Sequence, residues 1–235
     1  MKQDYLVFLV LGLMATSCQT LRDTPKYEFS SGVYWHKSAN QSLERVYVMV
    51  EDQQLSFFLI DKKSSEIDSA SAHRLDFTKE SRVYNPKSVF SRRSFDVDVL
   101  TIPFKFRPGL GDVPNQLTTN FNGAVYVGFR SDSYHLSYQQ TQLSNYRRHF
   151  SHFGYSLGLF TGIGSTYIQP LVMNNKLNID YEGVVWSKGV AGIVAVGNLT
   201  FGLGLGFDHL LDQNAKLWVY QGKPWLGLTL GLNLN

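Results

Sequence analysis

The sequence is poor in cysteine, in charge and in long apolar runs. One cysteine in 235 residues rules out a disulfide within a single chain. No apolar stretch approaches the roughly 20 residues that a membrane-spanning helix needs. The charged share is 17% and the net charge is only +3. Because no basic tract is interleaved with aromatic residues either, the sequence lacks the footprint of a nucleic-acid-binding protein, and no nucleic-acid partner is expected.

The most informative feature that is present is a two-residue alternation. Residues 225–235 carry leucine at every second position with Gly, Thr or Asn between, and residues 200–208 alternate Phe or Leu with mainly Gly. Side chains on a strand point to opposite faces in turn, so each segment has one apolar face and one small or polar face. This pattern is typical of an outer-membrane strand with lipid on one side and a narrow lumen on the other.

Six segments with this pattern predict an all-β fold, specifically an antiparallel transmembrane β-barrel. In the first segment the apolar positions slip by one residue to Leu100, Ile102, Phe104 and Phe106, which predicts a β-bulge near Pro103. A barrel whose interior is filled by side chains has about eight strands. We therefore expect about eight strands, the others coming from the N-terminal part or from further chains. The six segments are 94–107, 120–130, 153–164, 189–197, 200–211 and 225–235.

The alternative is a soluble barrel or sandwich, in which the apolar face points inward and the outer face carries charge. Residues 189–207 contain no charged residue, and the second face of this stretch is mostly Gly, Ala and Thr. Small side chains suit a tight lumen better than a water-exposed surface. The sequence therefore favours the membrane barrel.

The N-terminus is expected to be a processing segment. Residues 1–17 resemble a signal peptide. The run Ala15-Thr16-Ser17-Cys18 resembles a bacterial lipobox, which makes Cys18 the lipidated first residue of the mature chain and residues 18–26 a tether. Ordinary secretory cleavage after Ser17 is the alternative.

The region between tether and barrel is expected to form a small β-lobe with an irregular linker, at 27–93, ahead of the barrel at 94–235. Its extended segments are shorter than the roughly 9–11 residues of a crossing strand, which favours a water-facing lobe. The alternative, in which two of them join the barrel, stays open. The extended segments are 31–37, 45–51 and 54–61.

Loop lengths predict the orientation of the barrel. In bacterial barrels both termini lie in the periplasm, periplasmic turns are short and external loops are long. Residues 108–119, 169–183 and 211–225 are then external, and 138–149 and 197–198 are periplasmic. Aromatic and basic residues fall at both rims, as an interface belt requires. The belt comprises Arg92, Arg93, Tyr146, Arg147 and Arg148 at the periplasmic rim, and Trp186, Lys188, Lys223 and Trp225 at the outer rim.

The polar positions of the alternation predict a network inside the lumen. An isolated buried charge is very costly, so charges in a narrow barrel must be paired. Arg130 is accordingly expected to pair with Asp96 or Asp98. Such side chains fill the lumen and predict a plugged barrel rather than an open pore. The predicted network consists of Asp96, Asp98, Asn120, Asn122, Arg130, Asp132 and Asp208.

The sequence predicts no catalytic site, no metal site and no cofactor. His149 and His152 are three residues apart, so on a strand they face opposite sides and cannot share a metal. His135 and Ser137 share a face, as the Ser/His pair of outer-membrane lipid hydrolases does, but no third orienting group is identifiable. An enzyme that modifies lipids of the outer leaflet is therefore the least favoured class.

Several stretches together resemble uncharacterised small outer-membrane β-barrel proteins and lipoproteins of Bacteroidota. They are the lipobox-like start, Ile-Pro-Phe-Lys-Phe-Arg-Pro at 102–108, the run 199–211 and the terminal Leu/Gly alternation. The resemblance covers roughly 94–235 and implies location in the outer membrane of a Gram-negative bacterium, with a periplasmic N-terminus. It implies no activity and no catalytic residues.

Three classes of function follow from these features. The first is a structural or interaction barrel that binds a partner protein or a surface ligand through its loops and N-terminal lobe. The second is a narrow pore or small-ligand binder that uses the polar lumen. The third is the lipid-modifying enzyme. The first needs no special residues and is preferred, with outer-membrane lipid, a protein partner or a second copy of the chain as the expected partners.

Overall fold

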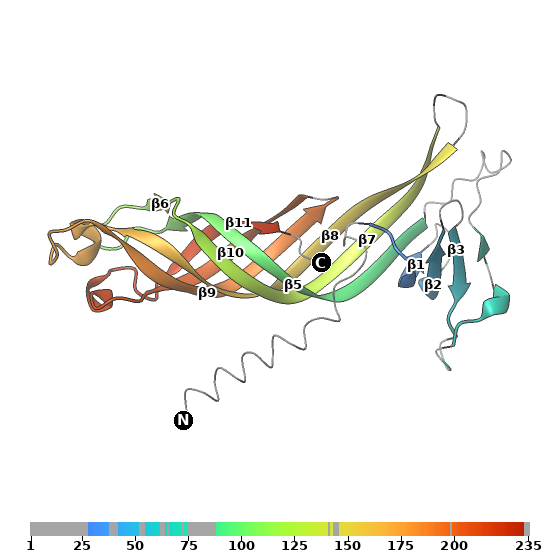
Figure 1. The fold of residues 1–235 in the computed structure, drawn as a ribbon, viewed down its shortest axis with the longest axis horizontal. Coiled ribbons are helices and arrows are strands. Elements are labelled where there is room, and N and C mark those ends of the chain that lie inside the picture. Colours follow the sequence, from blue (N-terminus) through green and yellow to red (C-terminus); the bar gives the residue numbers. More distant parts are fainter. Residues whose placement is uncertain are drawn as a thin grey trace.

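The protein is an all-β structure built around a closed ring of strands (Figure 1). The computed structural model describes residues 28–37, 42–51, 55–61, 64, 66–71, 73–74, 88–140, 142, 146–197 and 199–232. The expected signal peptide at 1–17, the tether at 18–26 and the lipidation site Cys18 lie outside the described residues.

Six antiparallel strands form the ring, each paired with its neighbours in the chain, and the last strand closes it by pairing with the first. The all-β, antiparallel prediction is therefore confirmed. The expectation of about eight strands is wrong for the ring, which closes with six. The ring strands are β5 (Ser88–Arg107), β7 (Asn122–Gln140), β8 (Tyr146–Ile168), β9 (Tyr181–Val196), β10 (Leu199–Leu210) and β11 (Pro224–Leu232).

The two-residue alternation separates the two faces of this ring. Large apolar side chains point outward and stay exposed; Phe121 and Phe129 are 75% and 77% exposed, and Leu157 is 68% exposed. Many of the inward positions between them hold small or polar residues, such as Gly202 and Gly204 on β10, and these are buried. Six strands enclose less space than eight, so a ring this narrow closes only where many inward positions lack a large side chain.

A bulge at Pro103 reverses the inward face of β5. Leu100 and Ile102 are fully buried inside the ring, whereas Phe104 and Phe106 point outward. The pairing of β5 with β11 gains one extra residue on β5 between Thr101 and Phe104. The bulge therefore lies at the predicted proline. The buried, inward-facing positions change from even to odd residue numbers at this proline, whereas the sequence predicted that the change comes before Leu100. The reason is that Leu100 and Ile102 belong to the apolar filling of the interior.

Four short strands form a lobe beside the ring: β1 (Gly32–Lys37), β2 (Glu44–Val50), β3 (Leu55–Leu59) and β4 (His73–Arg74). Only Trp35–Lys37 of β1 pair with β5, and β2 to β4 continue the sheet away from the ring (Figure 1). The lobe thus lies outside the ring. The linker expected up to residue 93 instead includes the start of β5 at Ser88.

The ring has two different ends. At the loop end lie three long connections, which contain β6 (Gln116–Thr118), the 3-10 turn η4 (Pro170–Met173) and the 3-10 turn η5 (Ala215–Leu217). At the lobe end, β9 and β10 are joined by residues 197–198 alone. The prediction of a long connection at 138–149 is wrong. The pairing of β7 with β8 continues beyond the ring as far as the pair Gln140 and Tyr146. The remaining 3-10 turn, η2 (Ser69–Ser71), belongs to the lobe.

Among the described residues, the structure contains no helix with the length and apolar character needed to cross a membrane.

Candidate functional site: the filled interior of the ring

The middle of the ring is filled by an apolar plug. Its largest member is Trp225, which is 1% exposed. The indole of Trp225 packs on the ring of Phe160, with 5.8 Å between centroids. Trp225 was predicted at the outer rim, and its position inside the ring corrects that prediction. Its side chain points to the same face of β11 as Thr229, the face opposite the alternating leucines. The plug consists of Leu100, Ile102, Ala124, Tyr126, Phe160, Ala191, Ile193 and Trp225.

Glycine on a neighbouring strand makes room for this indole. A Cβ on Gly206 would lie 2.4 Å from Cζ2 of Trp225, well inside van der Waals contact. On the outward face, by contrast, a Cβ on Gly192 would meet only Cδ1 of Leu157 at 4.0 Å. Inward glycine therefore has a steric role, since it lets one large aromatic side chain occupy a lumen only six strands wide.

A cationic cluster lies between the plug and the loop end. The Lys105 ammonium donates hydrogen bonds to Asp208 Oδ1 at 3.0 Å, to Asn122 Oδ1 at 2.7 Å and to Ser187 Oγ at 2.9 Å. Arg107 forms a second ion pair with Asp208. All three charged side chains are almost fully buried. One carboxylate is thus shared by two cations, and the Lys105 ammonium also lies 4.5 Å above the Trp225 ring.

An apolar cap closes the loop end above this cluster. The Arg107 guanidinium lies 5.5 Å from the Trp218 ring and 5.7 Å from the Tyr220 ring. Burial raises the pKa of the Tyr220 phenol, which remains protonated at neutral pH and donates to the carbonyl of Pro114 at 3.4 Å. The cap consists of Val113, Ile168, Val172, Met173, Val185, Leu210, Trp218 and Tyr220.

An acidic cluster lies on the other side of the plug, toward the lobe. Arg130 Nε donates to Asp132 Oδ1 at 2.8 Å, and His152 Nε2 lies 2.8 Å from the same oxygen. Asp96 and Asp98 are buried beside them and attract the Arg130 charge. The hydroxyls of Tyr126 and Ser156, 2.7 Å apart, connect this cluster to the plug.

A second apolar core closes the ring at the lobe end. Phe90 on β5 and Tyr134 on β7 contribute to it from the ring strands, and Tyr34 contributes from β1. Phe29 stacks on Phe150 with 4.3 Å between centroids. From one end to the other, the interior is therefore occupied by a cap, a cationic cluster, a plug, an acidic cluster and the lobe core.

The structure buries most of the predicted lumen residues inside the ring. Asp96, Asp98, Asn122, Arg130, Asp132 and Asp208 are all at most 4% exposed. Asn120 is different, because it precedes β7 and is only half-buried; its carbonyl accepts a hydrogen bond from Asn122. Arg130 forms an ion pair with Asp132, on the same strand, and the predicted partners Asp96 and Asp98 are buried close enough to act on its charge.

Sequence reasoning missed Lys105, Arg107, Ser187 and His152 as interior residues. For Lys105 and Arg107 the signal was the bulge, since a phase change at Pro103 puts every second residue from Lys105 onward inside. The inward orientation of Ser187 and His152 could have been read from the alternation, because each is adjacent in the chain to an outward residue, Trp186 or Phe153.

The other predicted belt residues with described side chains lie on the outer wall, at the lobe end or in the loop before β11. Lys188 stacks on Trp186 on the outer wall, with its ammonium 4.6 Å from the indole. Arg93 is exposed at the lobe end, Arg92 lies 5.7 Å from the Tyr34 ring, and Lys223 is exposed in the loop before β11. Tyr146, Arg147 and Arg148 belong to β8, but their side chains lie outside the described residues.

No group of three or more metal-ligating side chains occurs in the part of the chain that the structure describes. His149 is exposed and His152 is buried, as expected for residues on opposite faces of one strand. Ser137 Oγ donates to the backbone carbonyl of His149 at 3.4 Å. Comparison with known proteins found no matching family model, no matching curated protein and no matching solved structure.

Proposed function

We propose that the protein is a plugged outer-membrane β-barrel that anchors its lobe and loops at the membrane for interaction with a partner. The N-terminus and the lobe are then periplasmic, with Cys18 as an additional lipid anchor, and the loop end faces outward. The observation that carries the proposal is an exposed apolar outer wall around an interior filled with paired charges and aromatic rings.

The outer wall has the composition expected of a lipid-facing surface. On β10 the outward positions from Leu199 to Phe207 are all Leu or Phe and exposed, and the outward positions of β11 are leucines. A soluble protein rarely leaves a contiguous apolar surface of this extent open to water. Lys188 is a charged residue on this wall, and its ammonium lies against Trp186, as at a membrane interface.

The height of this wall fits a bilayer. On β8 the outward apolar side chains run from Phe153 to Ile163, a separation of ten residues. At about 3.3 Å per residue and a strand tilt of roughly 40–45°, ten residues rise about 24 Å along the ring axis. The lipid-facing band of outer-membrane barrels is about 25 Å tall.

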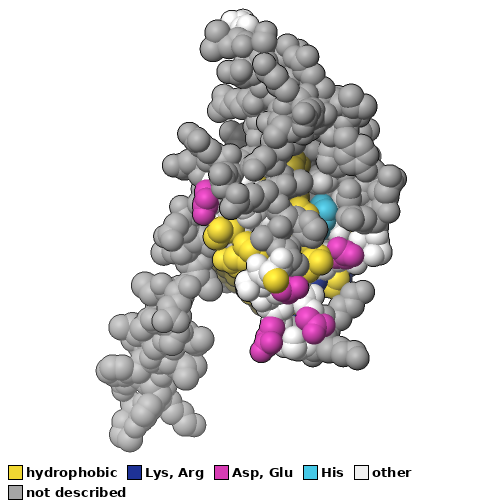
Figure 2. All heavy atoms as spheres, turned by 90° about the vertical axis from the view of Figure 1, so that its right-hand side faces the viewer, with side chains coloured by type: hydrophobic (Ala, Val, Ile, Leu, Met, Phe, Trp, Pro, Cys, Tyr) yellow, Lys and Arg dark blue, Asp and Glu magenta, His cyan; other side chains and the backbone are white. Residues whose placement is uncertain are grey.

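The lobe supplies the surface for interaction. Val33, Trp35 and Met49 are large apolar side chains of β1 and β2 that remain exposed. Acidic side chains surround apolar ones among the described residues on the lobe end (Figure 2), where Glu66 and Asp68 are exposed. A face with exposed apolar groups bordered by charge is typical of a protein-contact surface.

Planar-bilayer recording tests whether the barrel is plugged. We expect the purified full-length protein to give no stable open-channel steps, because the plug and both charged clusters obstruct every level of the lumen. A porin recorded in the same bilayer serves as the positive control. Large, stable conductance steps from the wild-type protein would contradict a plugged barrel and favour the narrow-pore alternative.

A further inference from the structure

We propose that the outer wall carries a binding site for one anionic phospholipid at its lobe end, with Arg93 as the phosphate ligand. The inference rests on the proposed membrane location and adds to it a specific ligand class and a specific site. It is carried by a pocket, by an exposed cation and by the change in surface chemistry at this level of the wall.

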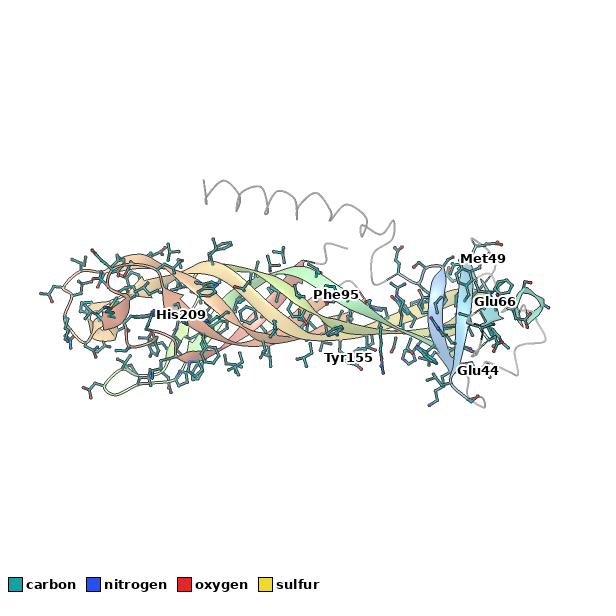
Figure 3. All side chains as sticks on the ribbon, turned by 90° about the horizontal axis from the view of Figure 1, so that it is seen from below. Glu44, Met49, Glu66, Phe95, Tyr155 and His209 are labelled. Atoms are coloured by element: carbon teal, nitrogen blue, oxygen red, sulfur yellow. The ribbon has the colours of Figure 1, made fainter. Side chains whose placement is uncertain are left out.

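The pocket has a volume of about 510 Å³, within the range of small-molecule sites. Phe95 and Tyr155, from β5 and β8, lie on the part of the ring nearer the lobe, whereas His209 lies on the part nearer the loop end (Figure 3). Phe95 and Phe129 pack edge to face with 5.9 Å between centroids. The lining residues are Arg93, Ser94, Phe95, Phe129, Arg130, Ser131 and Tyr155.

The surface changes from apolar to polar within this pocket. Phe95 and Phe129 are paired across β5 and β7, and both point outward. The next outward pair toward the lobe is Arg93 and Ser131, and Ser131 is paired in turn with Tyr155. At the lobe-side margin of the apolar band, an amphipathic lipid therefore finds a cation, a hydroxyl and a phenol close together near the depth of its headgroup.

Arg93 provides charge complementarity to an anion. Its side chain is exposed, and it forms no ion pair with a carboxylate of the described residues. The nearby Asp132 faces the interior, where Arg130 and His152 engage it. A guanidinium binds phosphate oxygens through two parallel hydrogen bonds, which an ammonium cannot reproduce.

The aromatic walls identify the anion as part of a lipid. Phe95, Phe129 and Tyr155 line the pocket and are each more than half exposed on the outward face of the ring. An acyl chain lying on the outward face of these strands buries these rings, whereas a free phosphate would leave them in contact with solvent. The phosphodiester headgroup of phosphatidylglycerol combines the required negative charge with such a chain.

Native mass spectrometry of the full-length protein in a neutral detergent tests this site. We expect the wild type to retain one phosphatidylglycerol in preference to phosphatidylcholine. Arg93→Gln should weaken retention roughly tenfold, the scale of one charge-assisted hydrogen bond. Arg93→Lys should bind with intermediate affinity. Lys223→Gln, which removes one equally exposed cation elsewhere, should bind like the wild type.

Three results would overturn the site. Equal loss of lipid in the Arg93→Gln and Lys223→Gln variants would mean general attraction by net charge. Unchanged retention in Arg93→Gln would remove Arg93 from the site, and displacement of the lipid by millimolar inorganic phosphate would make the ligand a free anion. Flotation of the wild type and of Arg93→Gln with lipid vesicles reports separately on membrane insertion: a wild type that does not float refutes the proposed membrane location, whereas loss of lipid retention from an Arg93→Gln variant that still floats concerns this site alone.

Discussion

Lysine in place of Leu203 is expected to destabilise the membrane-inserted protein by about 2–4 kcal/mol, the cost of a cationic side chain at the bilayer midplane. Leu203 points outward, is 60% exposed and lies halfway along β10. The substitution removes no interior contact. The expected loss therefore arises from the surrounding lipid, and urea unfolding of the protein in vesicles measures it.

Val196→Lys is the matched control for this variant. Val196 is also outward and half exposed, but it is the last residue of β9 and borders the short turn at the lobe end. A lysine there can reach the headgroups, so the cost should fall to about 0–1 kcal/mol. If the outer wall faced water, both substitutions would be nearly neutral, because surface changes seldom exceed about 0.5 kcal/mol. Equal effects at the two positions would contradict a lipid-facing wall.

Asp208→Asn is expected to destabilise the protein by about 3–5 kcal/mol, the cost of removing one partner from a buried ion pair. The amide keeps the shape of the carboxylate but leaves Lys105 and Arg107 buried without their shared counter-charge. Ser187, which donates to Asp208 Oδ1 at 2.6 Å, can still donate to the amide oxygen. The loss would therefore report the charge rather than the packing, and urea unfolding in vesicles again provides the measurement.

Two further variants separate this electrostatic effect from general damage. Asp112→Asn, in an exposed loop at the same end, should unfold like the wild type. Lys105→Met combined with Asp208→Asn should lose less stability than Asp208→Asn alone, because the double variant contains one uncompensated cation fewer. An Asp208→Asn protein as stable as the wild type would contradict the assignment of Asp208 as the neutralising group of the cationic cluster.

The sequence predicted the two faces of each strand well, because parity alone determines them. The burial of Asp96, Arg130 and Asp208 and the exposure of the Leu/Phe positions both follow from that period of two. Trp225 shares the face of Gly227 and Thr229, but it was predicted at the outer rim and not inside. The rim prediction failed because an aromatic residue near a lysine at a strand end looks the same in either setting.

The number of strands and the cationic cluster could not be read from local pattern. Closure with six strands depends on the register between β11 and β5, which lie more than a hundred residues apart in the chain. The same pairing contains the bulge at Pro103 that turns Lys105 inward. A local phase slip indicates that a bulge exists, but only the long-range pairing fixes the residue at which the face changes.

The outer wall of the ring is proposed to lie in lipid. The most direct test is refolding from urea into phosphatidylcholine vesicles of a chain that lacks residues 1–18, so that no lipid anchor contributes, followed by flotation in a density gradient. We expect the protein to float with the vesicles and the unboiled sample to migrate faster on a gel than the boiled one. Protein that folds but remains at the bottom of the gradient would contradict it.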